Sequence, residues 1–461
     1  MKDGALTILS VNTSDAGGGA ERVARELHES YFAAGADAWF AAGIRRSSAP
    51  QVVEIPNRQH RSIWARAMNR LADALPARGA GFHAARLLRG AVAEPRRSAR
   101  RRLGFEDFDF PGTASLLALT PRRPDVLHLH NLHGGYFDLR ELPAISAQVP
   151  TIVSLHDAWL VSGHCSHSLD CGRWEHGCGV CPALWIYPAV PRDETAFNWA
   201  RKRDIFARSA LFVSTPCVWM ADRVQRSMLA PAMRGLKVIP YGIDLSVFRA
   251  DDKRAARTAL GLDPSRSVML TTASSLRAQT WRDSAAFRGA LDRLGAGAAN
   301  AQWIALGESG PDEQIGMVTM RHVAFAPDDR TLVQWYQAAD AYVHPARADT
   351  FPLMILEALA CGTPVIASAI GGIPEQIVAA AMPGADVGMM DPAHATGALA
   401  KPGDALSLAN AIEWFTALDA PARAILSANA ARDAAIRFDS DRQVREYLEW
   451  MQTLVVRNAD E

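Results

Sequence analysis

Short apolar runs that resemble buried parallel strands recur along the chain, separated by segments in which apolar residues have helical spacing. Strands that alternate with helices predict a doubly wound α/β architecture. The first series ends near Ser214 and a second starts near Val268, with residues 236–248 as a connector. We therefore expect two α/β domains in tandem, sharing a ligand-binding cleft at the carboxyl ends of their strands. The apolar runs occupy residues 6–11, 37–42, 126–129, 151–155, 210–214, 237–240, 268–273, 302–306, 341–344 and 364–368.

The composition is that of a folded globular protein without bulk charge. The chain has 461 residues, 49% of them hydrophobic, and 49 Lys plus Arg against 49 Asp plus Glu. A net charge of zero gives no general attraction to nucleic acid. No run of 18 apolar residues is evident, and residues 1–4 lead into a strand-like segment without the features of a secretory leader. We expect a cytoplasmic protein that binds no nucleic acid.

One segment has a strong local charge. Between Arg61 and Arg102 the sequence holds eleven arginines against two acids, Asp73 and Glu94, with large apolar residues interleaved. A basic amphipathic segment of this kind can lie on an anionic membrane surface. The alternative is a solvated helical face whose charge is balanced by acids elsewhere in the fold.

Two polar segments follow strands of the first series. Gly17, Gly18 and Gly19 stand between the first strand and a helical run, where they would let a ligand approach the backbone near a helix N-terminus. They could equally form only a tight turn. His156 and Asp157 end the strand at 151–155, and we interpret His156 as functional because His130 and His133 follow the neighbouring strand, where they are weaker candidates.

A group of four cysteines lies within a single loop. A structural zinc site is one interpretation of their spacing, with a C-x2-C pair at its end, and His164 and His167 are close enough to serve as alternative ligands. Disulfides and buried thiols are the alternatives. Catalytic metal is not expected here, because a closed tetrathiolate site braces a loop without taking part in a reaction. The four cysteines are Cys165, Cys171, Cys178 and Cys181.

The second half of the chain carries the groups suited to a diphosphate and a sugar. Arg277 and Arg282 follow a strand near a helix start, where a guanidinium can hold a diphosphate, although surface arginines are the alternative. Asp349 and Glu357 put two carboxylates near one ligand, and such groups accept hydrogen bonds from sugar hydroxyls. No D-x-D metal motif is evident, so we favour a mechanism without a catalytic metal. The helix between the two acids begins with Phe351 and Pro352 and exposes amides that can meet phosphate.

The segment from Asp349 to Glu357 resembles the E-x7-E acidic pair of the retaining glycosyltransferases of family 4, and residues 371–375 resemble the glycine-rich loop that follows it there. Residues 17–21, 124–136, 156–157 and 239–244 with Phe248 occur in the order of that family, and the cysteine loop is similar to that of a bacterial exopolysaccharide subgroup. The resemblance implies the GT-B fold, with two Rossmann-like domains facing across a cleft. It places an acceptor domain at 1–218, with a C-terminal helix at about 441–461 packing back on it, and a donor domain at 236–435.

The resemblance also implies roles for individual residues. Glu357 would hold the ribose of a nucleotide sugar, Asp349 the hydroxyls of the donor sugar, and His156 the same sugar near its reacting carbon. The family retains the anomeric configuration without a protein nucleophile. The diphosphate would meet the amides near Leu353 from one domain and Gly18 and Gly19 from the other, so the residues expected to bind the donor are Gly17, Gly18, Gly19, Phe351, Pro352, Leu353, Met354 and Glu357.

This chain departs from the family at two places. Asp349 stands where a glutamate is usual, and Arg282-Asp283 stands where Lys-Gly is expected. Our leading hypothesis is a glycosyltransferase, peripheral on the inner face of the cell membrane, that extends a lipid-linked or oligosaccharide acceptor in surface polysaccharide assembly. A nucleotide-sugar epimerase of the same fold and a non-catalytic nucleotide-sugar-binding scaffold are the alternatives.

Overall fold

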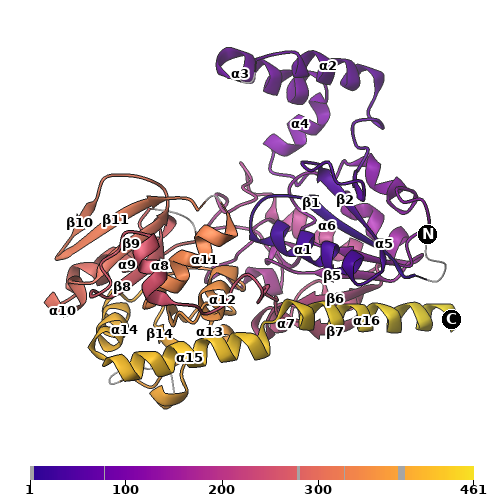
Figure 1. Ribbon diagram of the computed structural model, residues 1–461. Coiled ribbons are helices and arrows are strands. Elements are labelled where there is room, and N and C mark those ends of the chain that lie inside the picture. The colour runs from indigo at the N-terminus through magenta and orange to yellow at the C-terminus, as the bar shows by residue number, and fades with distance from the viewer. Residues whose placement is uncertain (1–4, 77, 278–280, 327, 383–389, 461) are drawn as a thin grey trace. The chain divides into compact units, whose positions relative to one another are not determined.

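The computed structural model describes residues 5–76, 78–277, 281–326, 328–382 and 390–460 (Figure 1). The chain divides into two compact units. Unit 1 comprises Met1–Thr215, Met220–Val238 and Glu446–Glu461, and unit 2 comprises Pro216–Trp219 and Ile239–Arg445. Among the described residues, no helix is both long enough and apolar enough to cross a membrane.

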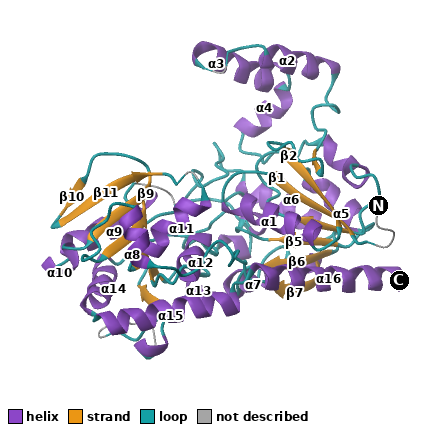
Figure 2. Cartoon of the chain, viewed as in Figure 1, coloured by secondary structure: helices purple, strands orange, loops and turns teal. Residues whose placement is uncertain are grey.

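Unit 1 is built on a seven-stranded parallel sheet in the order β3-β2-β1-β4-β5-β6-β7 (Figure 2). Strand β1 lies between β2 and β4, with Ile8 opposite both Ala38 and Val126, so the strand order reverses beside β1. Side chains such as Ile8 and Leu9 are fully buried, as expected for a parallel sheet covered on both faces. The strands are β1 (Thr7–Ser14), β2 (Asp37–Ile44), β3 (Val52–Glu54), β4 (Val126–Leu129), β5 (Thr151–Ser154), β6 (Leu211–Thr215) and β7 (Met233–Val238).

The helices that accompany this sheet range from one turn to several. Their bounds are α1 (Gly19–Ala33), α2 (Ile63–Asp73), α3 (Gly79–Leu87), α4 (Pro95–Arg102), α5 (Leu142–Ser146), α6 (Thr195–Phe206), α7 (Val218–Gln225) and α16 (Ser440–Asp460). Helices α7 and α16 contain residues of both units. The Tyr447 hydroxyl of α16 donates to Ser214 at 2.9 Å, and the ring of Trp450 contacts that of Phe212, so the end of the chain packs on the strand β6.

Unit 2 repeats the plan with the order β10-β11-β9-β8-β12-β13-β14, in which only β10 is antiparallel to its neighbour among the described strands. Strand β8 lies between β9 and β12, so the strand order again reverses beside the first strand of the unit. The strands are β8 (Val268–Thr272), β9 (Gln302–Gly307), β10 (Glu313–Ile315), β11 (Val318–Ala324), β12 (Ala341–His344), β13 (Val365–Ser368) and β14 (Gly397–Ala400).

Aspartate caps define where many helices of unit 2 begin. The carboxylates of Asp283 and Asp419, for example, accept from the N–H groups of Ala286 and Ala422. Such a cap is worth about 1 kcal/mol. The helices of this unit are α8 (Lys253–Ala259), α9 (Ser284–Arg293), α10 (Ala296–Ala299), α11 (Asp329–Ala338), α12 (Leu353–Ala360), α13 (Ile373–Gln376), α14 (Ala405–Ala417) and α15 (Ala420–Arg437).

The predicted fold class, two α/β domains with doubly wound parallel sheets, is confirmed by these two sheets. The expected strand at 237–240 is misplaced, because β7 spans Met233–Val238 and only half of the expected run lies within it. The expected connector at 236–248 therefore begins inside β7. Four strands were missed: β3 and β10 are three residues long, β11 alternates buried and exposed side chains, and β14 has the sequence Gly-Ala-Leu-Ala.

Candidate functional site

Asp349 of unit 2 lies among charged and polar groups at the carboxyl end of β12. Its Oδ2 atom is 3.0 Å from Nη1 of Arg282 and 3.5 Å from Nε2 of His344, the last residue of β12. Burial raises the pKa of the Asp349 carboxyl, but His344 and the Arg282 guanidinium outweigh burial and hold this pKa well below its usual range. The structure thus brings together two predicted site residues, Arg282 and Asp349, as an ion pair.

His344 links this pair to the core of unit 2. Its side chain is fully buried, Nδ1 lies 3.0 Å from the Tyr342 hydroxyl, and Nε2 lies 3.2 Å from Arg282 Nη1. Burial, reinforced by the charge of Arg282, lowers the pKa of His344 to about 4, so the ring is neutral at pH 7. No role is predicted for His344 from the sequence, although its place at a strand end indicates one.

Glu357 has a separate partner. It lies in the second turn of α12, is 3% exposed, and accepts a hydrogen bond of 2.9 Å from the hydroxyl of Tyr336 on α11. Because Tyr336 is 21 positions earlier in the chain, no local sequence pattern connects the two residues. The tyrosine fixes the rotamer of a carboxylate that could receive hydroxyl groups of a ligand.

The start of α12 offers backbone donors beside these carboxylates. The helix begins at Leu353, and Pro352 precedes it in an extended conformation. The first N–H groups of an α-helix have no intrahelical acceptor, and the N-terminal end carries partial positive charge. Leu353 and Met354 therefore lie where the sequence predicted phosphate-binding amides, and Phe351, just before the helix, is buried.

The glycine-rich loop after β13 supports the backbone of Asp349. Gly371 has φ +60°, and a Cβ atom there would lie 1.8 Å from the carbonyl oxygen of Asp349. The N–H of Gly372 donates to the carbonyl of Thr350 at 3.0 Å. A side chain at Gly371 would thus displace the loop that carries Asp349. Within the described residues, the Thr350 hydroxyl is buried and has no hydrogen-bond partner.

Arg277 is placed differently from Arg282. Its side chain is 58% exposed and pairs with Glu308 at 2.7 Å, whereas Arg282 is 10% exposed and immediately precedes the cap of α9. The residues between them, 278–280, lie outside the described part of the chain. The structure therefore joins Arg282, but not Arg277, to Asp349.

The three glycines of unit 1 lie at the turn between β1 and α1, and all three are exposed. Gly18 is the cap residue of α1, and no side chain occupies the cap position. The neighbouring Asp15 holds this turn against the end of β2, because its carboxylate accepts from the N–H groups of Arg46 at 2.7 Å and Ser47 at 2.8 Å. The backbone of Gly17–Gly19 is thus accessible at a helix N-terminus.

Three histidines lie together at the carboxyl ends of β4 and β5. His130 Nδ1 is 3.0 Å from His156 Nε2, and the ring of His130 also lies against that of His128. Burial lowers the pKa of His156 to about 4 and that of His128 to about 3, so these rings are neutral at pH 7. The structure thus brings His130 and His156 together, as the sequence predicted for neighbouring strand ends.

The remaining candidates of this edge form a second pair. His133 Nε2 lies 2.8 Å from Asp157 Oδ2, while Oδ1 of Asp157 accepts from the N–H of Trp159. Burial lowers the pKa of His133, but the charge and hydrogen bond of Asp157 outweigh burial and raise it. Asp157 therefore pairs with His133 and raises its pKa, whereas His156 contacts the imidazole of His130.

The cysteine loop lies near the buried Lys202. No disulfide joins the cysteines, all six of which are described. Cys178 Sγ accepts from the N–H of Gly163, and His164 Nε2 is 3.4 Å from Cys181 Sγ. Burial raises the pKa of Cys165 to about 12 and that of Cys178 to about 11. Over the described ranges, no group of three or more His, Cys, Asp or Glu is arranged to hold a metal ion. The zinc site stays a prediction.

The fold is the GT-B fold of glycosyltransferases. The structure of HepE from Anabaena in complex with UDP-glucose matches with a TM-score of 0.58 at 18% identity, covering 97% of this chain and 100% of HepE. Residues 318–433 match the family described as "Glycosyl transferases group 1". This segment contains the glycine-rich loop and both carboxylates of the candidate site, Asp349 and Glu357.

Two curated relatives are similar over a larger share of the chain. WcaC of Escherichia coli K12, a putative colanic acid biosynthesis glycosyl transferase, is 29% identical over 263 residues, which cover 53% of this chain and 60% of WcaC. D-inositol 3-phosphate glycosyltransferase 1 of Catenulispora acidiphila is 30% identical over 297 residues, 61% of this chain and 64% of the relative. The chain thus spans less than two thirds of the length of these relatives.

Proposed function

We propose that this protein is a retaining, metal-independent glycosyltransferase that moves a sugar from a nucleotide sugar to a lipid-linked or glycan acceptor in bacterial surface polysaccharide synthesis. The observation that carries the proposal is the cluster in unit 2, where Arg282, Asp349 and Glu357 lie at a sheet edge with the start of α12. A guanidinium and helix amides suit a diphosphate, and the carboxylates suit hydroxyl groups. The UDP-glucose bound to HepE supports a nucleotide sugar as the donor. The description of WcaC as a colanic acid biosynthesis glycosyl transferase supports a role in polysaccharide synthesis.

The arrangement supports a division of roles. Glu357, oriented by Tyr336, would accept hydrogen bonds from ribose hydroxyls, and Asp349 would accept them from the donor sugar. Arg282 would hold the diphosphate together with the first amides of α12, and its charge would stabilise the phosphate as it leaves. Because Arg282 already rests against Asp349 and His344, its orientation is set before a donor binds.

In the proposed reaction the bond between the anomeric carbon and the phosphate oxygen breaks, and a bond to the acceptor oxygen forms on the same face of the sugar. The acceptor proton passes to the leaving phosphate, so no side chain has to act as a nucleophile or take that proton. His156 is neutral at pH 7, because burial lowers its pKa, and it would contact the transferred sugar as a hydrogen-bonding group.

The test is a panel of UDP-, GDP-, ADP- and dTDP-sugars, offered to the purified protein with EDTA, while binding and nucleotide release are followed. We expect one donor class to bind and to be slowly hydrolysed without metal. Glu357→Gln should weaken donor binding about 10- to 100-fold and reduce hydrolysis accordingly, because an uncharged amide accepts fewer and weaker hydrogen bonds than a carboxylate. The matched control is Glu449→Gln, at an exposed position of α16.

Other outcomes of this experiment would favour a different function or mechanism. If the donor alone is converted to a different sugar nucleotide, the protein is an epimerase. If a donor binds but neither hydrolysis nor transfer to any of a broad acceptor set is seen, it is a binding scaffold. Activity that returns only when Mg²⁺ or Mn²⁺ replaces EDTA would overturn the metal-independent mechanism, and an inverted anomeric product would overturn retention.

A further inference from the structure

Between β3 and β4 the chain of unit 1 leaves the sheet and forms a helical insertion, defined here as residues 61–103. It consists of α2, α3, the short helical segment Leu88–Val92 and α4, which pack on one another. Figure 1 shows these helices standing away from the sheet of their own unit. This insertion contains the arginine-rich segment of the sequence.

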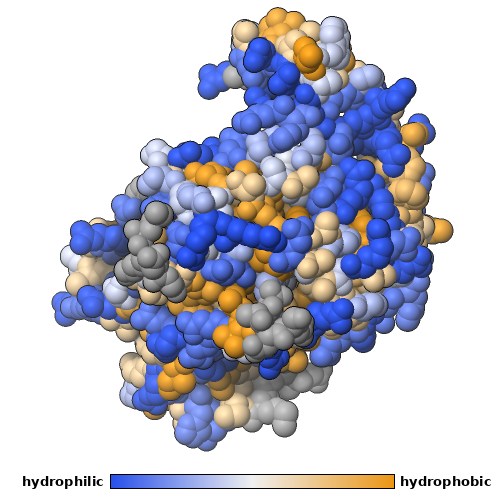
Figure 3. Space-filling model, turned by 90° about the vertical axis from the view of Figure 1, so that its right-hand side faces the viewer, coloured by the Kyte–Doolittle hydropathy of each residue, from blue (hydrophilic) through white to orange (hydrophobic). Residues whose placement is uncertain are grey.

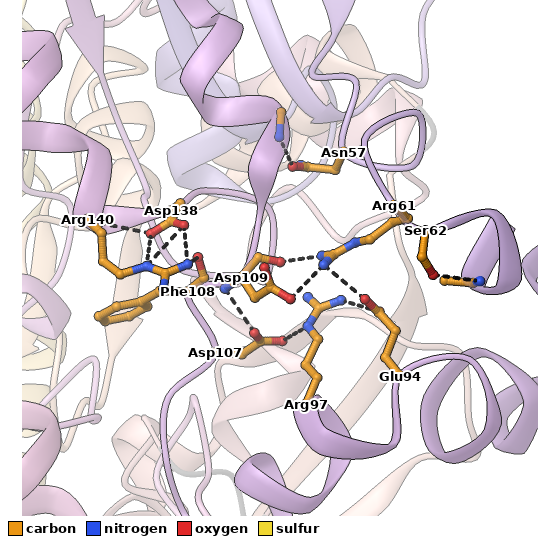
Figure 4. A network of polar contacts seen from close by, with 12 residues as sticks. Asn57, Arg61, Ser62, Glu94, Arg97, Asp107, Phe108, Asp109, Asp138 and Arg140 are labelled. Atoms are coloured by element: carbon orange, nitrogen blue, oxygen red, sulfur yellow. Dashed lines mark hydrogen bonds and ion pairs between the residues drawn. The ribbon is translucent and has the colours of Figure 1, made fainter.

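Two arginines attach the insertion to the rest of unit 1 (Figure 4). Arg61 Nη1 lies 2.9 Å from Glu94 and 2.7 Å from Asp109, and Arg97 lies 2.7 Å from both Glu94 and Asp107. The side chains of Arg61 and Arg97 are only 9% and 19% exposed. The charges of Arg61 and Arg97 are therefore balanced by acids of the fold, by Glu94 within the segment and by Asp107 and Asp109 beyond it.

Most of the other arginines remain uncompensated. Arg89 shares Asp73 with Arg58, and Arg100 lies over the ring of Phe105. The rest are exposed and form no ion pair with any residue that the structure describes. The nearby acids Asp107 and Asp109 already pair with Arg97 and Arg61. The insertion therefore presents a positive surface. Its unpaired arginines are Arg66, Arg70, Arg78, Arg86, Arg96, Arg101 and Arg102.

Large apolar side chains are exposed among these arginines. Ile63 is 79% exposed, Leu87 55% and Phe82 49%. Trp64 donates to the carbonyl of Val92, which holds its indole in place although its side chain is 56% exposed. Figure 3 shows apolar and charged residues side by side at the top of the view, over this insertion.

On α2 the two kinds of side chain share the outward surface. Ala65 and Ala72 are buried against the neighbouring segments, while Ile63 and Leu71 are exposed. Residues 63, 67 and 71 are four apart and so lie on one face of the helix. Arg66 and Arg70 precede 67 and 71 by one position and flank this face. Such a surface can insert its apolar side chains into a lipid interface while its guanidinium groups contact the anionic headgroups around them.

We propose that this insertion docks unit 1 on an anionic lipid bilayer, with Ile63, Phe82 and Leu87 entering the interface and the unpaired arginines contacting lipid phosphates. Only a bilayer offers acyl chains beneath a layer of phosphate and so matches both components of the surface. Arginine also pairs with phosphate in a bidentate geometry. The inference goes beyond the proposed function, since the proposed reaction assigns no role to any residue of the insertion.

The experiment is sedimentation of the full-length protein with vesicles of phosphatidylcholine, with or without phosphatidylglycerol. We expect pelleting only with phosphatidylglycerol, weakened by added salt. The triple variant Arg66→Gln, Arg70→Gln and Arg86→Gln should reduce the partition coefficient roughly 100-fold, at about fivefold per arginine. Arg61 and Arg97 are left intact, because their loss would detach the insertion. The matched control changes the exposed residues Arg254, Arg330 and Arg432 of unit 2 to Gln and should bind like the wild type.

A second variant tests the apolar component separately. Ile63→Ser with Phe82→Ser should weaken binding at high salt more than at low salt, whereas Ile436→Ser with Val456→Ser, at exposed positions 69% and 63% accessible, should not. Equal unfolding midpoints would confirm that all variants are folded. The proposal is overturned if the wild type does not pellet with anionic vesicles, or if the control triple loses as much binding as the insertion triple. Because no transfer is measured, these results are independent of the proposed reaction.

Discussion

The two units place histidines at corresponding strands, and their surroundings give these histidines different chemistry. Strands β4 and β12 each neighbour the first strand of their own sheet. After β4, an imidazole faces another imidazole, since His130 and His156 are 3.0 Å apart. At the end of β12, His344 faces the ion pair of Arg282 and Asp349. Burial thus keeps the rings of His130 and His156 neutral in unit 1, whereas the opposite charge of Arg282 keeps Asp349 ionised in unit 2, beside groups suited to a diphosphate.

Acid should affect unit 1 most. Burial lowers the pKa of His128 from 6.5 to about 3 and that of His156 to about 4, so the unfolded chain takes up these protons first as the pH falls. The stability they contribute is therefore complete above pH 6.5 and is lost as the pH falls from 6.5 to about 4 for His156 and to about 3 for His128, at about 1 kcal/mol per pH unit and histidine. His344 acts in the same direction in unit 2, and His133 opposes it in unit 1, because Asp157 raises its pKa.

Hydrogen exchange measured from pH 7 to pH 4.5, corrected for the intrinsic exchange rate, should test this difference. Protection should fall more in β4 and β5 than in β12 and β13. His156→Gln should flatten the pH dependence of the unfolding midpoint, because a side chain that does not titrate replaces the buried imidazole. A parallel loss of protection in both units would contradict the proposed difference between the two edges.

Substitutions at the two edges should separate binding from transfer. Asp349→Asn removes the charge that faces Arg282 and should lower donor affinity about 10- to 100-fold, as expected for loss of a charged hydrogen bond. His156→Gln should lower the transfer rate by a similar factor and change donor affinity less. Calorimetric binding and initial rates would measure both quantities.

The exposed Asp312→Asn serves as the matched control in unit 2, and it should change neither quantity. Asp349→Asn and His156→Gln could instead reduce donor affinity equally and leave the rate of sugar transfer from the bound donor unchanged. That result would contradict the assignment of donor binding to Asp349 and of transfer to His156.

The smallest effects should come from the tyrosines behind each edge. The Tyr342 hydroxyl contacts His344, and the Tyr447 hydroxyl contacts Ser154 and Ser214. Replacing either tyrosine by phenylalanine should lower the free energy of unfolding by about 1 kcal/mol. Only Tyr342→Phe should also weaken donor binding, because His344 orients Arg282 and Asp349. Denaturant titration with a binding isotherm distinguishes the two, and equal binding by both variants would argue against His344 as a positioning residue.

The two carboxylates of the candidate site were predictable because they are close together in the sequence. Asp349 and Glu357 belong to a single strand–loop–helix segment, so the local pattern placed both. His344 was missed as a partner, and Tyr336 was missed altogether, because their contacts depend on how α11 and β12 pack. The pairing of Arg61 with Asp109 was likewise invisible, since 48 residues separate the two.

The sequence by itself determined the alternation of strands and helices, the restart that makes two sheets, and the position of the acidic and glycine-rich segments. These follow from local spacing of apolar residues and from backbone preferences, which act over a few residues. Tertiary structure alone decided which charges are compensated: Arg282 by Asp349, Arg97 by Asp107, and Arg66 by no described residue. Coulombic and desolvation energies depend on the distance between charges and on their burial. Local sequence patterns determine neither the distance nor the burial.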